Sequence, residues 1–176
     1  MYIFCKESAF TLLELIITIA IVAIIISIAL PSFHHFRAQQ EVSQLLTTIR
    51  QNVNLSKSLA TSYHNNIVMC SSSNLTNCEN DQWNKGFIIF NDTNNNKQRE
   101  NNELLHKVIK TDFRYGNLRW NGGSVNSKSI IFQGDTGLPR GSQGNFTYCS
   151  FNHKENHRYI PLSPMGHTRI ETISSC

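Results

Sequence analysis

Hydrophobic residues form one long, almost uninterrupted block near the start of the chain. Residues 10–31 read FTLLELIITIAIVAIIISIALP, with Thr11, Glu14, Thr18 and Ser27 as the polar positions. As an α-helix rising about 1.5 Å per residue, this block extends roughly 33 Å, enough to cross the hydrocarbon core of a bilayer. The pattern therefore predicts a membrane-spanning helix with one carboxylate near its N-terminal end, and an ionisable group in that position indicates a function.

Two other interpretations of this block fit less well. The core helix of a soluble protein is rarely apolar on every face. A cleaved signal peptide usually has an apolar region of about 7–15 residues and a small-residue cleavage site. Here the apolar region is longer and ends in ALPSF. We therefore interpret residues 10–31 as a retained membrane span and residues 1–9 as a short leader. The positive charge of Lys6 favours the cytoplasmic side of the membrane for this leader.

The helical pattern continues beyond Pro31 and changes from uniformly apolar to amphipathic. Pro31 inside a continuous helix predicts a kink, because proline removes one backbone hydrogen bond. The helix should end within residues 63–66. Apolar or small residues recur at steps of three and four along this second half, residues 32–65, at Val42, Leu45, Leu46, Ile49, Val53, Ser56 and Ala60.

After residue 66 the pattern changes to short β-like runs separated by Asn, Gly and Ser. Close spacing and turn residues predict antiparallel strands rather than βαβ units. The amphipathic helix and a sheet with one apolar face predict a two-layer α+β fold, in which residues 66–176 form the β-rich globular domain. The predicted strands are residues 67–70, 86–90, 104–109, 129–132, 146–151, 158–162 and 168–173.

Charge is distributed unevenly along the 176 residues. Residues 10–103 contain six Lys/Arg and seven Asp/Glu, whereas residues 104–176 contain nine Lys/Arg and four Asp/Glu. A basic C-terminal half indicates either an anionic partner or simple solubility and docking to an acidic protein.

Five cysteines divide into one before the block and four after it. Cys70, Cys78, Cys149 and Cys176 allow three disulfide pairings. A local bridge between Cys70 and Cys78 is favoured because the two flank a short polar turn. The remaining pair would then tie Cys176 to Cys149. Disulfides require an oxidising compartment, which agrees with a periplasmic or extracellular domain.

The start of the chain resembles the class III signal of type IV pilins and pseudopilins. The matching residues are ESA-FTLLEL followed by the apolar helix. In that family a prepilin peptidase cuts before a Phe and methylates the new N-terminus. The fifth residue of the mature chain is Glu and the twenty-second is Pro. Cutting between Ala9 and Phe10 places Glu14 and Pro31 at those positions; the family prefers Gly where this chain has Ala9.

Later segments are similar to the GspH/FimT group of minor pilins and pseudopilins. That group has a long helix with an Arg before its end, matched by Arg50, and a strand ending in Cys, matched by Cys70. A Phe followed by a Gly, here Phe132 and Gly137, matches approximately, with one extra residue between them. The group's Trp-x-x-Gly-x-x-x-Phe-x-Asp segment corresponds to Trp83, Gly86, Phe90 and Asp92.

The resemblance implies a type IV pilin fold and a subunit that assembles with other pilins or pseudopilins. It implies a single-pass protein of the bacterial inner membrane with a periplasmic C-terminal domain, later part of a type IV pilus or a type II secretion pseudopilus. The implied partners are the prepilin peptidase and the inner-membrane assembly platform. Glu14 would pair with the N-terminal amine of a neighbouring subunit, and Pro31 would share in assembly.

The resemblance also implies an alternative role, DNA binding in natural transformation. Some FimT-like pilins bind DNA through a C-terminal Gly-Arg-x-Arg motif, which looks like Gly166-His167-Thr168-Arg169 here. Because His167 replaces the first Arg, that contact would depend on pH. Basic residues give salt-sensitive binding to phosphates. The candidates are Arg140, Lys154, Arg158, His167 and Arg169.

Two residue patterns resemble metal sites but fit simpler interpretations. Asp92, Asn94, Asn96 and Glu103 resemble a calcium ladder, but Lys97 stands where the required Gly should be, so we predict a polar loop. Cys149, His153 and His157 are spaced by four, but the surrounding residues predict a hairpin rather than a metal-binding helix. Catalytic motifs are lacking. We therefore predict no enzyme activity, no metal and no cofactor.

Overall fold

The computed structural model describes residues 11–123 and 128–176, which divide into two compact units, one ending at Arg37 and the other spanning Ala38–Cys176. A single helix, α1 (Leu12–Tyr63), begins in the first unit and ends in the second. Its C-terminal end agrees with the predicted stop. Pro31 lies inside α1, as predicted.

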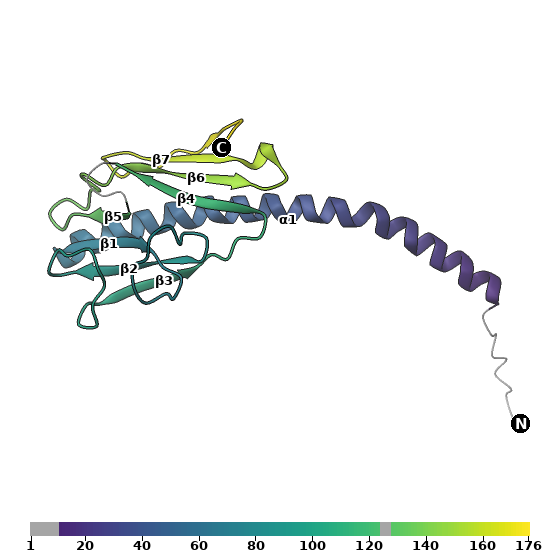
Figure 1. Ribbon diagram of the computed structural model, residues 1–176, viewed down its shortest axis with the longest axis horizontal. Coiled ribbons are helices and arrows are strands. Elements are labelled where there is room, and N and C mark those ends of the chain that lie inside the picture. Colours follow the sequence, from purple (N-terminus) through teal and green to yellow (C-terminus); the bar gives the residue numbers. More distant parts are fainter. Residues whose placement is uncertain (1–10, 124–127) are drawn as a thin grey trace, which may run out of the picture. The chain divides into compact units, whose positions relative to one another are not determined.

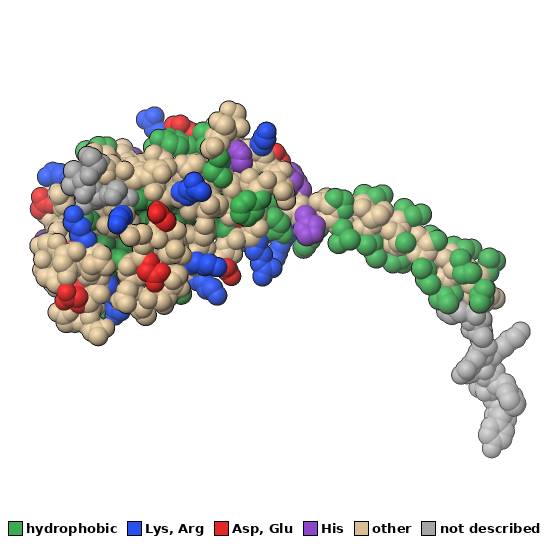
Figure 2. Space-filling view, viewed as in Figure 1, with side chains coloured by type: hydrophobic (Ala, Val, Ile, Leu, Met, Phe, Trp, Pro, Cys, Tyr) green, Lys and Arg blue, Asp and Glu red, His purple; other side chains and the backbone are tan. Residues whose placement is uncertain are grey.

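The N-terminal part of α1 is apolar on all sides and buries nothing in the described chain. Every residue from 11 to 34 is exposed, including a run of large aliphatic side chains such as Ile24 at 62%. Figure 2 shows hydrophobic side chains covering the visible face of this part. It is long and apolar enough to cross a membrane by length and composition. Such a surface requires a cover, either lipid or other helices.

From Ala38 onward one face of α1 is buried at the predicted helical spacing. Its apolar residues join the main hydrophobic core together with residues of both β-sheets. Burial of this stripe holds the helix in place, since a helix in water is stabilised mostly by packing of its apolar face. The buried positions are Ala38, Val42, Leu45, Ile49, Asn52, Val53, Ser56 and Ala60.

The β-strands form two antiparallel four-stranded sheets, seen as two groups of arrows in Figure 1. Sheet A has the strand order β3-β2-β1-β5, and sheet B has the order β4-β6-β7-β8. The strands of sheet A are β1 (Asn66–Ser71), β2 (Gly86–Asp92), β3 (Leu105–Lys110) and β5 (Ser129–Phe132). Those of sheet B are β4 (Gly116–Gly122), β6 (Gly144–Ser150), β7 (Arg158–Leu162) and β8 (Glu171–Thr172).

Strands β1, β2 and β5 of sheet A are buried on both faces, whereas one apolar face was predicted. Alternate residues of β1 and β2 face the main core. The residues between them form a second, outer cluster, which includes Val68, Ile88 and Phe90, each with no exposed surface. Cys78 and Leu105 pack against that cluster. The two-sided burial explains why these strands read as continuous hydrophobic runs rather than as an alternating pattern.

Most predicted strands are confirmed, and β4 is the one missed. β5 and β7 match their predicted bounds, while the last strand is reduced from residues 168–173 to Glu171–Thr172. β4 has only Leu118 and Trp120 as buried hydrophobic residues between polar neighbours. Gly122 at its end, followed by Gly123, is typical of a turn. The α+β class, with a long helix packed on antiparallel sheets, is confirmed.

Candidate functional site

Glu14 lies in the first turn of α1 and caps its own helix. The Thr11 N–H donates to the Glu14 carboxylate at 3.0 Å, and the Glu14 N–H donates to the Thr11 hydroxyl at 3.3 Å. This reciprocal pair is a capping box, in which two otherwise unpaired helix N–H groups are satisfied. In a single chain the carboxylate is therefore already hydrogen-bonded, and its negative charge lies at the positive end of the helix dipole.

The predicted cleavage site, Ala9 and Phe10, lies outside the described residues. Within the exposed apolar part of α1, the hydroxyls of Thr18 and Ser27 donate to carbonyl oxygens one turn earlier, at 2.8 and 2.7 Å. Both polar side chains are thus satisfied by the helix itself. Glu14 is the one ionisable side chain from residue 11 to residue 33.

Glu41 connects α1 to sheet B through three hydrogen bonds. Its carboxylate accepts the N–H groups of Arg114 at 2.8 Å and Tyr115 at 3.1 Å, in the segment between β3 and β4. It also accepts the hydroxyl of the buried Tyr148 at 2.7 Å. Burial, followed by the hydrogen bond and charge of Glu41, raises the pKa of Tyr148 above its ordinary value, so the phenol remains a donor.

Two disulfides join the four cysteines that follow the apolar block. Cys70 is bonded to Cys78, and Cys149 is bonded to Cys176. These are the pairs that the sequence favoured among three possibilities. The first bond fastens the 72–79 loop beside the outer cluster of sheet A, and the second fastens the end of the chain to β6.

The loop between β2 and β3 is organised by two buried carboxylates. Asp92 accepts two N–H groups from residues 96–97, both at 3.1 Å. Glu103 accepts the N–H groups of Thr93 at 2.9 Å and Glu100 at 3.1 Å. Burial raises the pKa of Asp92, with the nearby Glu103 charge as a smaller cause. Main-chain N–H groups of the loop thus donate to both carboxylates, so the polar loop is held together by its own residues.

Four of the five candidate DNA-binding residues lie at two ends of sheet B. Lys154 lies in the turn between β6 and β7 and Arg158 is the first residue of β7, whereas Arg140 precedes β6 and His167 lies in the turn after β7. From Arg158 to Leu162, the first and last residues of β7, the strand rises by four residue steps, which is about 13 Å at roughly 3.3 Å per residue. Arg169 donates its N–H to a carbonyl of β7 between them.

Two of these five side chains are engaged within their own loops. The Arg140 guanidinium lies 3.7 Å from the Asp135 carboxylate. The Arg158 guanidinium donates to the carbonyl oxygens of Glu155 at 2.6 Å and His157 at 2.8 Å. The other three candidate side chains are exposed.

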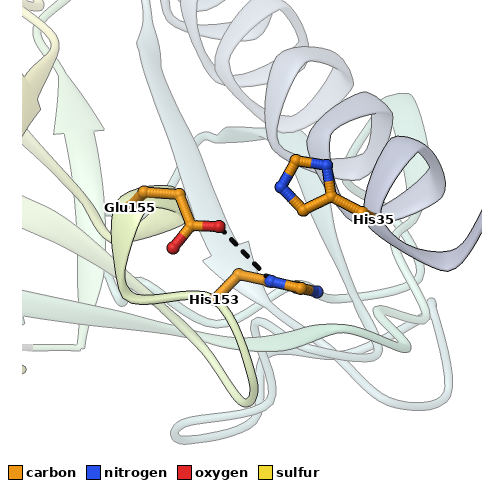
Figure 3. A group of neighbouring side chains, drawn as sticks. All are labelled: His35, His153 and Glu155. Carbon is orange, nitrogen blue, oxygen red and sulfur yellow. Dashed lines mark ion pairs between the residues drawn. The ribbon is translucent and has the colours of Figure 1, made fainter. Parts of the chain in front are cut away.

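The histidines near Cys149 have structural contacts of different kinds. His157 is buried, and its Nδ1 accepts the Ser150 N–H at 3.0 Å. His153 forms an ion pair with Glu155 at 3.3 Å when protonated, drawn as a dashed line in Figure 3. Because Cys149 is in a disulfide and His157 Nδ1 is occupied, the evenly spaced Cys149, His153 and His157 do not form a ligand set.

Comparison with known proteins gives the family. The model of the family described as type II transport protein GspH matches residues 46–166. This chain belongs to the GspH family. The model of the prokaryotic N-terminal methylation motif matches residues 5–30, which include Glu14. No curated protein matches the chain in sequence.

A solved structure shows the same fold as this GspH-family chain. A crystal structure of the type IV minor pilin FimU from Pseudomonas aeruginosa strain PAO1 aligns with a TM-score of 0.50 at 13% identity, covering 78% of this chain and 90% of that one. Another crystal form of FimU aligns with a TM-score of 0.47 at 15% identity, covering 76% and 91%. The predicted minor-pilin fold is therefore confirmed. The family and the fold are those of structural pilins rather than enzymes, and the apolar helix with its methylation motif fits a membrane-anchored pilin.

Two structural residues were not singled out from the sequence. Glu41 looked like one more polar residue on the outer face of the helix. Lys57 also looked like a surface residue, but its Nζ donates to the Met165 carbonyl at 3.3 Å. A Cβ on Gly166 would come within 3.0 Å of the Lys57 side chain. Their partners lie far away in the sequence, so helical periodicity carried no signal for either.

Proposed function

We propose that this GspH-family protein is a minor subunit of a type IV pilus or a type II secretion pseudopilus. The protein enters the bacterial inner membrane through the apolar part of α1, with its C-terminal domain in the periplasm. A prepilin peptidase cleaves it between Ala9 and Phe10 and methylates Phe10. The mature subunit then passes from the membrane into a filament of pilins with the help of an inner-membrane assembly platform.

The observation that carries this proposal is the fully exposed, apolar first part of α1. A soluble monomer does not leave such a surface in water, because each buried CH₂ group is worth about 0.8 kcal/mol. Lipid covers it before assembly. In a filament, apolar helices of neighbouring subunits take the place of lipid. Pro31 marks the end of this apolar part and the start of the amphipathic one.

Glu14 is the residue that we assign to subunit register. After cleavage an incoming subunit carries a positive N-terminal amine at Phe10. In a medium of low dielectric constant, this amine and a carboxylate on a neighbouring helix attract strongly. An unpaired charge there is costly. The capping box keeps the carboxylate satisfied by Thr11 in the single chain, and a neighbouring amine then supplies a stronger, charged donor.

Replacement of Glu14 by leucine tests this assignment. We expect Glu14→Leu to insert in the membrane like the wild type but to be missing from sheared filaments. The loss of the cap costs about 0.5–2 kcal/mol, which is small for a helix of 52 residues. Ser27→Leu is the matched control, because it removes another polar side chain from the same helix. Normal incorporation of Glu14→Leu would refute the register role.

A second candidate function is DNA binding during DNA uptake, favoured by the exposed cationic residues of the C-terminal half. Lys154, His167 and Arg169 have exposed side chains. Contacts of this kind with phosphates are independent of base sequence and weaken as salt rises. Arg140 and Arg158 would first have to leave their present partners. This role is compatible with assembly into a filament.

A gel shift with labelled duplex DNA over a series of salt concentrations tests the second function. The full chain in detergent micelles should retard DNA at low salt and release it as salt rises. Arg169→Gln should lower the slope of log K against log salt by about one. Arg119→Gln, on the outer face of sheet B, is the control. Absence of any shift at low salt would remove the DNA role and leave the filament role intact.

A further inference from the structure

The last fourteen residues, 163–176, form a segment that we call the C-terminal arm. The arm runs back along β7, the strand that precedes it. It supplies no side chain to either hydrophobic cluster of the described chain. Two of its larger apolar side chains are outside, with Met165 58% exposed and Ile170 40% exposed, and Ile173 is half-buried. Packing of apolar surface therefore contributes little to holding the arm in place.

Few non-covalent contacts attach the arm to the rest of the domain. Strand β8 pairs with β7 over two residues, and Thr168 forms an isolated bridge with Leu162. The Arg169 N–H donates to the Pro161 carbonyl at 3.4 Å. A strand pair this short is marginally stable in water by itself.

One side chain from α1 holds the turn at the start of the arm. Lys57 donates to the Met165 carbonyl, and its aliphatic stem lies against Gly166. Gly166 has a φ of +70°, which other residues adopt only with strain. This contact anchors residues 163–168 but leaves residues 169–176 beyond its reach.

The far end of the arm is attached covalently. Cys176 is bonded to Cys149 on β6, across a separation of 27 residues. Cys176 is exposed and Cys149 half-buried. In the other disulfide Cys70 is 1% exposed and lies inside the outer cluster of sheet A. The two bonds therefore differ in how easily a thiolate can reach them.

We propose that the C-terminal arm is a redox-controlled cover over the β7 edge, locked by the Cys149–Cys176 disulfide and released when a dithiol reduces that bond. A thiolate of the dithiol attacks Sγ of Cys176, and the Cys149 thiolate leaves. The second thiolate of the dithiol then displaces Cys176 from the mixed disulfide. The dithiol ends as a disulfide, while Cys149 and Cys176 gain two electrons and, from water, two protons.

Release of the arm changes sheet B in two ways. Strand β7 becomes an edge strand, whose open main-chain groups can pair with another extended segment. His167 and Arg169, which the arm carries, lose their fixed positions beside β7. The inference rests on the contacts of the arm and does not depend on the proposed filament or DNA roles.

The test uses the full chain in detergent micelles. Free thiols, including Cys5, are first blocked with an alkylating reagent, and the protein is then treated with increasing dithiothreitol. A second, isotopically distinct reagent labels newly formed thiols for peptide mapping. Hydrogen–deuterium exchange is followed at the concentration where Cys149 and Cys176 are labelled. The double variant Cys149→Ser/Cys176→Ser gives the released state without a reductant, and Cys70→Ser/Cys78→Ser is the matched control.

We expect Cys149 and Cys176 to be labelled before Cys70 and Cys78. Peptides from residues 163–176 and the β7 edge should lose their protection, while β1, β2 and β6 keep theirs. The Cys149→Ser/Cys176→Ser variant should show the same local loss, and the control variant should keep the arm protected. The proposal is overturned if Cys70–Cys78 is reduced first, if the arm stays protected after its bond is broken, or if the whole domain loses protection in the double variant.

Discussion

Replacing Glu41 by glutamine should loosen the attachment of α1 to sheet B while leaving the size of the side chain unchanged. The carboxylate accepts three hydrogen bonds, two from main-chain N–H groups and one from Tyr148. Glutamine has one oxygen, and its NH₂ group cannot accept. At least one of the three donors therefore loses its partner, and the others lose the advantage of a charged acceptor.

The magnitude follows from ordinary hydrogen-bond free energies. A bond to a charged group contributes about 1.5–3 kcal/mol and a neutral bond about 0.5–1.5 kcal/mol, while an unpaired buried donor costs about 1–3 kcal/mol. Glu41 is half-buried rather than buried, so solvent reduces these values. We expect Glu41→Gln to lower the free energy of unfolding by about 2–3 kcal/mol. Tyr148→Phe removes one donor and should cost about 1–2 kcal/mol.

Intrinsic fluorescence during urea unfolding is a suitable assay. The chain has two tryptophans, Trp83 and Trp120, and both are buried in the main core. Their emission therefore reports on the β-rich unit and not on the apolar part of α1. With a slope of about 1–3 kcal/mol per molar urea, Glu41→Gln should move the midpoint of unfolding down by about 0.7–3 M.

A double-mutant cycle identifies the contact responsible. If the Glu41–Tyr148 hydrogen bond exists as described, the double variant should be more stable than the sum of the single effects predicts, by about 1 kcal/mol. Glu171→Gln removes an exposed carboxylate and serves as the control, with an effect within about 0.5 kcal/mol. A midpoint for Glu41→Gln equal to that of the control, or strict additivity in the cycle, would refute this reasoning.

Two further variants test a half-buried position, His106, and a buried one, Gly116, elsewhere in the β-rich unit. Burial lowers the pKa of His106 from its usual 6.5, so the unfolded chain takes up this proton more readily and stability should fall as pH drops below about 6.5. Between pH 7.5 and pH 5.5 the urea midpoint should therefore fall less for His106→Gln than for the wild type. An equal fall in the two proteins would contradict this. At Gly116 a Cβ would overlap the ring of the buried Tyr148, so Gly116→Ala should cost about 1–3 kcal/mol in the same assay. The exposed Arg119→Ala on the same strand should have little effect, and equal midpoints for the two would count against this packing.

Much of the fold was predictable because it depends on local patterns. The apolar block, the heptad-like stripe from Val42 to Ala60 and most of the strands follow from side-chain periodicity. The helix end at Tyr63 was predicted from the His-Asn-Asn run at residues 64–66. β4 was missed because its hydrophobic residues are few and its ends are glycines, so its strand character comes from pairing with β6 along its whole length.

The candidate site was likewise predictable in part from the sequence. The position of Glu14 in the chain marks it as unusual, since it is a single acid in an apolar block, but its partner in the capping box appears only in the structure. The basic residues of the C-terminal half can be counted from the sequence. Their distribution over two ends of sheet B, with Arg140 and Arg158 already engaged, depends on strand register and loop conformation.

The sequence by itself determined that this chain has a membrane-type helix with one acid, an amphipathic continuation and an antiparallel β-rich domain. The hydrophobicity of a segment and the spacing of its apolar residues are local properties, so they can be recognised in the sequence without knowing the fold. Only the tertiary structure decided that β1, β2 and β5 of sheet A are buried on both faces, that Glu41 joins α1 to sheet B, and that the C-terminal arm is held by Lys57 and Cys149. These contacts join residues far apart in the sequence, so they exist only once the chain has folded.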